Sequence, residues 1–158
     1  MSSPARRRMT GIGRVLVAVY GIMALAALGR SFVQIAQRFD EAPVAYSLSA
    51  LAAAVYVVAT LALVFAGTRP WYIVASVAIT FELLGVLVVG SLSLLLPDVF
   101  QHPTVWSVFG YGYLFIPLVL PFVGLWWLRT HPPVSQSEAA SVATSESGAG
   151  TSATEARR

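Results

Sequence analysis

The chain has 158 residues, of which 57% are hydrophobic and 11% are charged, and its formal net charge at pH 7 is +3. Soluble globular domains carry about 25% charged residues. A chain this poor in charge cannot enclose all of its apolar surface in one water-soluble core. Its length allows one bundle and not two domains. The absence of cysteine excludes disulfides, thiolate metal sites and iron–sulfur clusters.

Four apolar runs are each long enough to cross a bilayer, which takes about 20 residues of helix. They lie at about 15–35, 44–66, 71–96 and 104–128, and the joints between them, DEAP (40–43), GTRP (67–70) and PDVFQHP (97–103), hold helix-ending residues. We therefore predict an all-α fold, a four-helix transmembrane bundle over 15–128. A basic cytoplasmic segment at 1–14 and a disordered Ser/Ala/Thr-rich cytoplasmic tail at 129–158 flank it.

The first run follows a basic stretch that contains Arg6, Arg7 and Arg8. The basic start, the apolar stretch and Ala24-Leu25-Ala26 imitate a secretory signal peptide. The run continues beyond that point and three more runs follow it, which favours a retained span. Its end, RSFVQIAQRFDE at 30–41, is amphipathic. It can be an ordinary helix end, or a helix that lies on a lipid surface or against a partner.

The third run contains a single acidic residue, Glu82, about eleven residues from its start and so near the bilayer midplane. A charge there costs about 2.5–3.5 kcal/mol. The carboxyl group must therefore be neutral, or pair with a cation inside the bundle. Counting depth at about 1.5 Å per residue identifies Arg30, Tyr56 and Tyr113 as groups that can reach it. We predict that these four residues form an intramembrane polar contact or proton site.

Small residues share the face of the third run that carries Glu82. They are Ala75, Ala78, Gly85 and Ser93. Because small residues let membrane helices approach closely, we predict a helix-packing face on which Glu82 points at another helix and not at lipid. Three roles remain open for the carboxyl group: a hydrogen-bonding group within the chain, a contact with a polar group of a partner subunit, or a site that carries protons or binds a cationic substrate.

The fourth run contains Pro117 and Pro121, which are four residues apart and therefore share a helix face. Each proline removes a backbone hydrogen bond and bends a helix. Gly110, Gly112 and Gly124 add flexibility. We predict a hinge or kink at the two prolines. It can be a gate, or a static bend that fits the bundle.

The distribution of arginine predicts the orientation of the bundle. Basic residues precede the first run, separate the second from the third at Arg69, and follow the fourth at Arg129. Because basic residues mark the cytoplasmic side of a membrane, both termini are predicted to be cytoplasmic. Tryptophans agree with these boundaries: Trp71, Trp126 and Trp127 fall at the predicted inner interface and Trp106 at the outer one.

No motif in the sequence indicates catalysis or a cofactor. It has no Walker loop, GxSxG or HExxH pattern. Its two histidines, His102 and His131, fall on opposite sides of the predicted membrane, so we expect no metal site, no haem and no other cofactor. The arginines flank apolar runs and do not form a patch with interleaved aromatic residues, which argues against nucleic-acid binding. We therefore expect a protein that is not an enzyme.

The four spans and the single intramembrane Glu82 make the chain generically similar to the small multidrug resistance transporters. In that family the essential glutamate lies in the first span, whereas Glu82 lies in the third, so no residue role is transferred. With its Arg-rich start and Ala/Ser/Thr-rich tail, the chain resembles more closely the small four-span integral membrane proteins of uncharacterised function that are common in actinobacteria. That resemblance implies the architecture and no activity.

The sequence therefore predicts a multi-pass protein of the cell membrane that acts as a non-enzymatic accessory or scaffolding subunit. Its partners would be the lipid bilayer and other membrane subunits or further copies of itself. Glu82 and its small-residue face would form the contact. The alternative is a small oligomeric proton-coupled transporter or channel, in which Glu82 is the proton site.

Overall fold

The computed structural model describes residues 11–98 and 102–133, and these residues form helices joined by short connections. The elements in chain order are α1 (Ile12–Arg38), η1 (Phe39–Glu41), α2 (Pro43–Val64), α3 (Arg69–Leu95), η2 (Ser107–Tyr113) and α4 (Ile116–Thr130), where η marks a 3-10 helix. The predicted all-α class is confirmed for this part of the chain. Most of the predicted N-terminal segment and tail lies outside the described residues.

Proline sets the starts of α2 and α3. Pro43 is the first residue of α2 and Pro70 the second residue of α3. The N–H groups in the first turn of a helix have no acceptor within the helix. Proline has no N–H group, so it fits there without the loss of a hydrogen bond. These two helices begin and end within two residues of the predicted spans. The helices α1, α2 and α3 are long and apolar enough to cross a membrane.

The expected continuous helix over 104–128 is wrong. Residues 107–113 form η2, whose axis is bent by 98° from that of α4. Neither helix is long enough to cross a membrane alone, so a fourth crossing would have to consist of η2 and α4 together. Leu114 and Phe115 join them with positive φ angles of 55° and 58°. Pro117 explains the late start of α4, because it has no N–H to donate to residue 113 and its ring would collide with that carbonyl. The chain therefore turns ahead of Pro117, and Pro121 lies inside α4.

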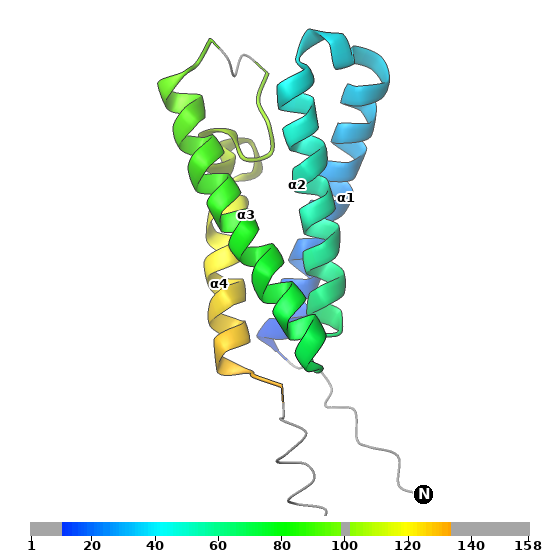
Figure 1. The fold of residues 1–158 in the computed structure, drawn as a ribbon, viewed down its shortest axis with the longest axis vertical. Coiled ribbons are helices and arrows are strands. Elements are labelled where there is room, and N and C mark those ends of the chain that lie inside the picture. The colour runs from blue at the N-terminus through cyan, green and yellow to red at the C-terminus, as the bar shows by residue number, and fades with distance from the viewer. Residues whose placement is uncertain (1–10, 99–101, 134–158) are drawn as a thin grey trace, which may run out of the picture.

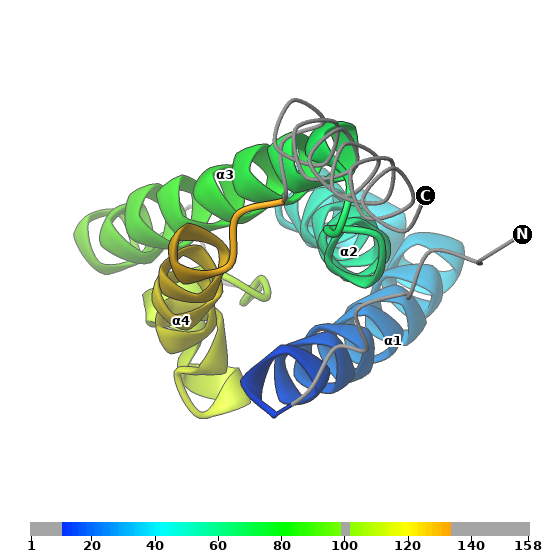
Figure 2. The same ribbon diagram turned by 90° about the horizontal axis from the view of Figure 1, so that it is seen from below.

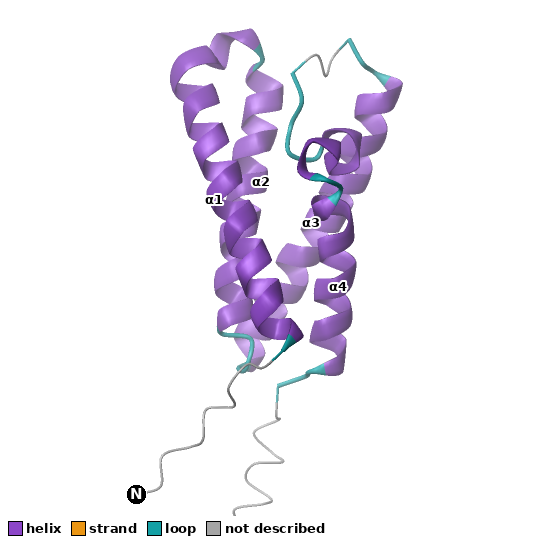
Figure 3. Ribbon diagram, turned by 180° about the vertical axis from the view of Figure 1, so that it is seen from behind, coloured by secondary structure: helices purple, strands orange, loops and turns teal. Residues whose placement is uncertain are grey.

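The four α-helices follow one another around the bundle in chain order, as Figure 2 shows. Figure 1 shows that α1 begins and α4 ends at the same end of the bundle, beside the junction of α2 and α3. Arg14, Arg69 and Arg129 lie there, so we call this end the arginine half. The turn between α1 and α2 and the connection from α3 to η2 lie at the opposite end, which we call the loop half (Figure 3).

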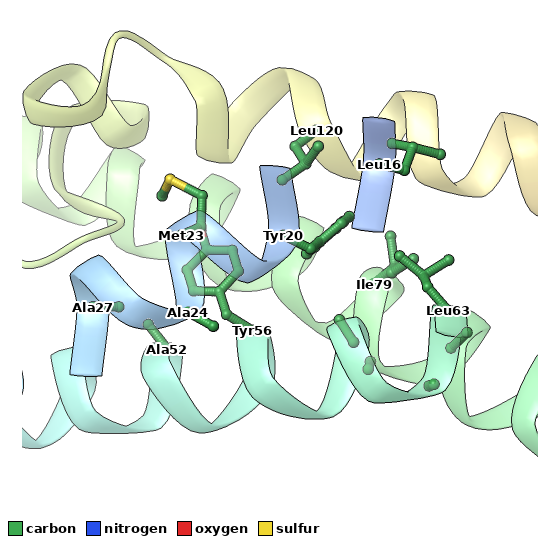
Figure 4. Packing of buried hydrophobic residues seen from close by; sticks show 14 of the residues in the cluster. Leu16, Tyr20, Met23, Ala24, Ala27, Ala52, Tyr56, Leu63, Ile79 and Leu120 are labelled. Carbon is green, nitrogen blue, oxygen red and sulfur yellow. The ribbon is translucent and has the colours of Figure 1, made fainter. Parts of the chain in front are cut away.

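Buried residues recur at alternating spacings of three and four along each long helix. On α2 the buried residues include the series Ala45, Ser49, Ala52, Tyr56, Ala59 and Leu63, and Tyr46, Ala53 and Ala62 widen the same face. This spacing produces a straight apolar seam between helices that cross at a small angle. Alanine dominates the seam between α1 and α2, with Ala24, Ala27 and Ala52 lying where the two helices approach each other (Figure 4). Its short side chains allow the close approach that membrane helices favour.

Candidate functional site

Glu82 lies at the middle of α3 and is completely buried by its own chain, with 0% of its surface exposed. The hydroxyl of Tyr20, on α1, donates a hydrogen bond of 2.8 Å to Oε2 of this carboxyl group. The bond links two helices that are separated by α2 in the sequence. Glu82 therefore points into the bundle, and one of its oxygens is held there by a tyrosine.

Tyr56 brings a second hydroxyl to the same place from α2. Its ring centroid lies 6.2 Å from that of Tyr20, and Figure 4 shows both rings among the apolar side chains between α1 and α2. Tyr56 is close enough to Glu82 and Trp106 for their polar groups to interact, although no hydrogen bond of good geometry joins them. As a result Oε1 of Glu82, the Tyr56 hydroxyl and Nε1 of Trp106 are buried without a protein partner.

Trp106 reaches this cluster because its segment folds back into the bundle. Sequence reasoning placed Trp106 at the outer interface, but it is 2% exposed. The Oγ1 of Thr104 accepts hydrogen bonds from the backbone N–H groups of Trp106 and Ser107, at 3.2 and 3.0 Å. The Oγ of Ser93 accepts one from the N–H of Val108, at 2.7 Å. These bonds occupy the backbone N–H groups of Trp106, Ser107 and Val108, which lowers the cost of burying a non-helical segment.

Two glycines on α3 make room for that segment. A Cβ added to Gly85 would lie 2.8 Å from the Trp106 ring, and one added to Gly90 would lie 2.6 Å from the Phe109 ring. Both distances are shorter than any van der Waals contact between carbon atoms. The aromatic rings therefore rest directly on the backbone of α3, and Trp106 lies on the loop-half side of the Glu82 cluster.

The structure brings together only some of the predicted polar site. Glu82 and Tyr56 lie together, but the Arg30 guanidinium donates a hydrogen bond to the carbonyl of Pro103 instead of reaching Glu82. Tyr113 is half-buried and packs against the apolar core, and within the described residues no hydrogen bond joins it to Glu82. Arg30 therefore ties α1 to the connection between α3 and η2, at the loop half.

The predicted small-residue face is buried inside the chain itself. Ala75 and Ala78 lie in the core, and Ser93 and Gly85 lie under the segment that carries Trp106. Glu82 and this face were expected to form a contact with a partner subunit. They are covered by α1, by α2 and by the segment that runs from Trp106 into η2 of the same chain, so this geometry assigns them to internal packing.

Tyr20 is the functional candidate that sequence reasoning missed. On the first span depth counting selected Arg30, because it treated side chains as points near the level of their own backbone. A tyrosine side chain extends about 6 Å from its Cα, and packed helices are tilted relative to one another. The available signal was the spacing of Tyr20 with Leu16, Ala24 and Ala27, which places it on the buried face of α1.

A second polar cluster lies at the surface of the loop half. Nε2 of His102 lies 3.8 Å from Oε2 of Glu41, and Arg38 lies 4.0 Å from the same oxygen. The Tyr46 hydroxyl is 3.5 Å from it. The side chains of Glu41 and His102 are 49% and 40% exposed, so water screens these contacts and each contributes little. In the described residues, no three His, Asp or Glu side chains gather closely enough to hold a metal ion.

Comparison with known proteins adds no relative: no family model matches the chain, and no curated protein or solved structure shows significant similarity to it. The chemistry must therefore be inferred from the geometry. Glu82 has one oxygen bonded to Tyr20 and one oxygen without a protein partner, which is the arrangement of a carboxyl group that can accept or release a proton at Oε1 while Tyr20 keeps it in position.

Proposed function

We propose that the chain is a multi-pass integral protein of the cell membrane, a four-helix transmembrane bundle with both termini cytoplasmic. The η2–α4 pair would serve as the fourth crossing. Three long apolar helices support this proposal, as does the gathering of Arg14, Arg69 and Arg129 at one end of the bundle, because basic residues favour the cytoplasmic side. The polar segment that carries Asp40, Glu41 and His102 would then lie outside the cell.

Within that membrane, the chain would act as a non-enzymatic accessory or scaffolding subunit. The observation that carries this proposal is the apolar outer surface. Large aliphatic and aromatic side chains are exposed along every long helix, for example Leu25 and Phe32 on α1, Val77 and Leu84 on α3, and Phe122 on α4. The carboxyl group of Glu82 is buried within the chain and bonded to Tyr20. Contacts with other subunits would therefore form by close packing of these apolar helix faces and not through the carboxyl group.

The test is the composition of the particle purified in mild detergent from its native membrane. We expect the chain to remain in the membrane pellet after alkaline carbonate extraction and to copurify with other membrane proteins in a fixed ratio. Recovery in the soluble fraction would contradict membrane insertion. A pure monomer would contradict the accessory role. A reporter fused after Arg158 that is active only outside the cell would contradict the orientation.

A small oligomeric proton-coupled transporter or channel is the second candidate. The observation that favours it is Oε1 of Glu82, which is buried without a protein partner and could bind a proton. A pure homo-oligomer in the purification would point to this alternative. In that case Glu82→Gln should abolish proton-coupled flux while leaving assembly intact, because Gln keeps the hydrogen bond from Tyr20 and removes the titratable group. Flux that survives this substitution would exclude Glu82 as the proton site.

A further inference from the structure

The buried polar atoms that have no protein partner are unevenly distributed along the bundle. In the described residues they belong to the side chains of Gln34, Ser31, Ser49, Trp106, Tyr56 and Glu82. Native proteins bond nearly all such groups, either to protein or to ordered water, because an unbonded buried polar group costs about 1–3 kcal/mol. Tyr56 lies close to Glu82 and Trp106, so these three groups can serve one another in part, and bound water would complete their hydrogen bonds and those of Gln34, Ser31 and Ser49.

These groups lie at successive depths between the loop half and Glu82. Ser31 and Ser49 lie on facing helices, each about 10 Å along its helix from the turn that joins α1 to α2. Gln34 lies one turn closer to that turn on the same face of α1 as Ser31. Trp106 rests on Gly85, one helical turn from Glu82 on the side of the loop half.

Tyr56 completes the series at the depth of Glu82. It lies on α2, whose N-terminus is in the loop half, and side chains on a helix tilt toward its N-terminus. Its hydroxyl is therefore directed back toward Glu82 and Trp106, to which it is close. Ser49 lies on the same buried face of α2, two turns nearer to the loop half.

The arginine half is packed in a different way. Its buried residues are apolar, and they include Leu16, Ala59, Leu63, Ala75, Ile79, Leu120 and Leu128. Gly124 lets α4 approach α3 so closely that an added Cβ would lie 3.1 Å from Ile79. Among the described residues of this half, no buried side-chain polar atom lacks a protein partner. Water that entered from this end would find nothing to bond to.

We propose that water reaches Glu82 from the loop half, along a path lined by Gln34, Ser31, Ser49, Trp106 and Tyr56, and that Glu82 exchanges protons with that side of the membrane alone. The proton of a hydronium ion forms an O–H bond to Oε1 of the carboxylate, which becomes a neutral carboxylic acid and leaves one water molecule. Oε2 keeps its hydrogen bond to Tyr20. The reverse step returns the proton to water on the same side.

Water fits this path better than a metal cation does. The indole of Trp106 has an N–H group that can only donate a hydrogen bond, so it repels a cation but bonds to a water oxygen. The serine and tyrosine hydroxyls can donate or accept, and a buried water needs two to four such partners. The inference rests on the membrane insertion proposed above. An accessory subunit would keep this one-sided access, whereas a proton-coupled transporter would also need a second conformation in which Glu82 reaches the arginine-half side.

The absence of cysteine allows a direct test with single-cysteine variants of the full chain. Ser49→Cys and Ala59→Cys form a matched pair, because both positions are on α2 and both are 0% exposed. The chain would be reconstituted in vesicles with one orientation and treated with methyl methanethiosulfonate. This small reagent dissolves in lipid and in water, and it reacts with thiolate and not with thiol. The modification rate, followed by mass spectrometry, therefore reports water at the sulfur.

We expect Ser49→Cys to react at least tenfold faster than Ala59→Cys. Raising the pH by one unit on the loop-half side should accelerate the Ser49→Cys reaction several-fold, whereas the same change on the arginine-half side should leave it unchanged. Equal rates at the two positions, or a rate that follows the pH on the arginine-half side, would overturn the proposal. If the chain fails to insert into vesicles at all, the membrane proposal itself fails, so the two failures can be told apart.

Discussion

The two halves of the bundle solve the problem of packing four helices by different means. In the arginine half, alanine, leucine and isoleucine side chains close the space between helices. In the loop half, a non-helical segment folds back between the helices and brings Trp106, Ser107 and Thr104 into the interior. Glu82 lies where the two halves meet. The difference shows that Glu82 is not an isolated polar residue in an apolar helix. Its carboxyl group lies at the boundary between the apolar interior of the arginine half and the more polar interior of the loop half.

The largest expected effect comes from placing a second acid in each half. Ala59→Asp introduces a carboxyl group into the apolar arginine half, where we expect it to lower the free energy of unfolding by about 3 kcal/mol. Ser49→Asp makes the equivalent change at an equally buried position of the same helix in the loop half, where polar partners are present. We expect a loss of less than half that size. Thermal unfolding in detergent would measure both, and equal losses would remove the distinction between the halves.

The next comparison uses two glycines that each contact a tryptophan ring. A Cβ at Gly85 would lie 2.8 Å from Trp106 in the loop half, and one at Gly13 would lie 2.6 Å from Trp127 in the arginine half. The backbone around Trp106 is fixed by hydrogen bonds that its N–H groups donate to Thr104 and Ser93, whereas Trp127 lies near the end of α4. We expect Gly85→Ala to cost about 2 kcal/mol of unfolding free energy and Gly13→Ala about 1.

Gly29→Ala is the control for this pair, because nothing lies within 4 Å of its added Cβ. Alanine favours a helix over glycine by about 1 kcal/mol, so this variant should be as stable as the parent chain or more so. A Gly85→Ala variant that unfolds at the same temperature as Gly29→Ala would show that Trp106 is not held against α3.

At the boundary itself, Tyr20→Phe tests the hydrogen bond to Glu82. Removing it should lower the free energy of unfolding by about 1 kcal/mol, since interhelical hydrogen bonds in membranes are worth about 0.6–1.7 kcal/mol. Tyr56→Phe removes a hydroxyl that has no direct protein partner, so its effect should be smaller. Urea or detergent titration of the two variants would rank them, and a larger loss for Tyr56→Phe would contradict the geometry described for the carboxyl group.

The smallest effect is expected at the surface of the loop half. Glu41→Gln removes the charge that Arg38 and His102 approach at 4.0 and 3.8 Å. Exposed ion pairs contribute about 0–1 kcal/mol, so we expect the unfolding free energy to change by less than about 0.5 kcal/mol. If Glu41→Gln lowers the free energy of unfolding as much as Tyr20→Phe does, these surface contacts stabilise the loop half and are not merely screened ion pairs.

The sequence predicted the parts of the fold that local chemistry determines. The bounds of α2 and α3 follow from Pro43, Pro70 and the polar joints around them. The inward direction of Glu82 follows from the small residues on its face. The fold of residues 104–115 could not be predicted in the same way. Val108 has a φ of 49°, which a β-branched residue adopts only where tertiary contacts hold it, here the bond from its N–H to Ser93.

The partners of Glu82 were predicted less well than its direction. Depth counting found Tyr56 but chose Arg30, which bonds to Pro103 instead. It overlooked Tyr20, and the tryptophan pattern assigned Trp106 to the membrane surface. Both errors have the same origin: the reach of a long side chain and the return of a loop into the bundle depend on how helices tilt against one another. Neither is encoded in the spacing of residues along one helix.

The unequal lengths of neighbouring helices have a consequence for the lipids around this protein. α3 has 27 residues and α4 has 15, which at about 1.5 Å per residue makes them about 40 and 22 Å long. The hydrocarbon layer of a bilayer is about 30 Å thick. Lipids beside α3 would therefore stretch and those beside α4 would compress. The bilayer would then be thicker on the α3 side of the protein, its thick flank, than on the α4 side, its thin flank. Two copies, or a copy and a partner with a matching short helix, would relieve the strain by joining their thin flanks. The bilayer itself would thus favour one orientation of approach before any side chain makes contact.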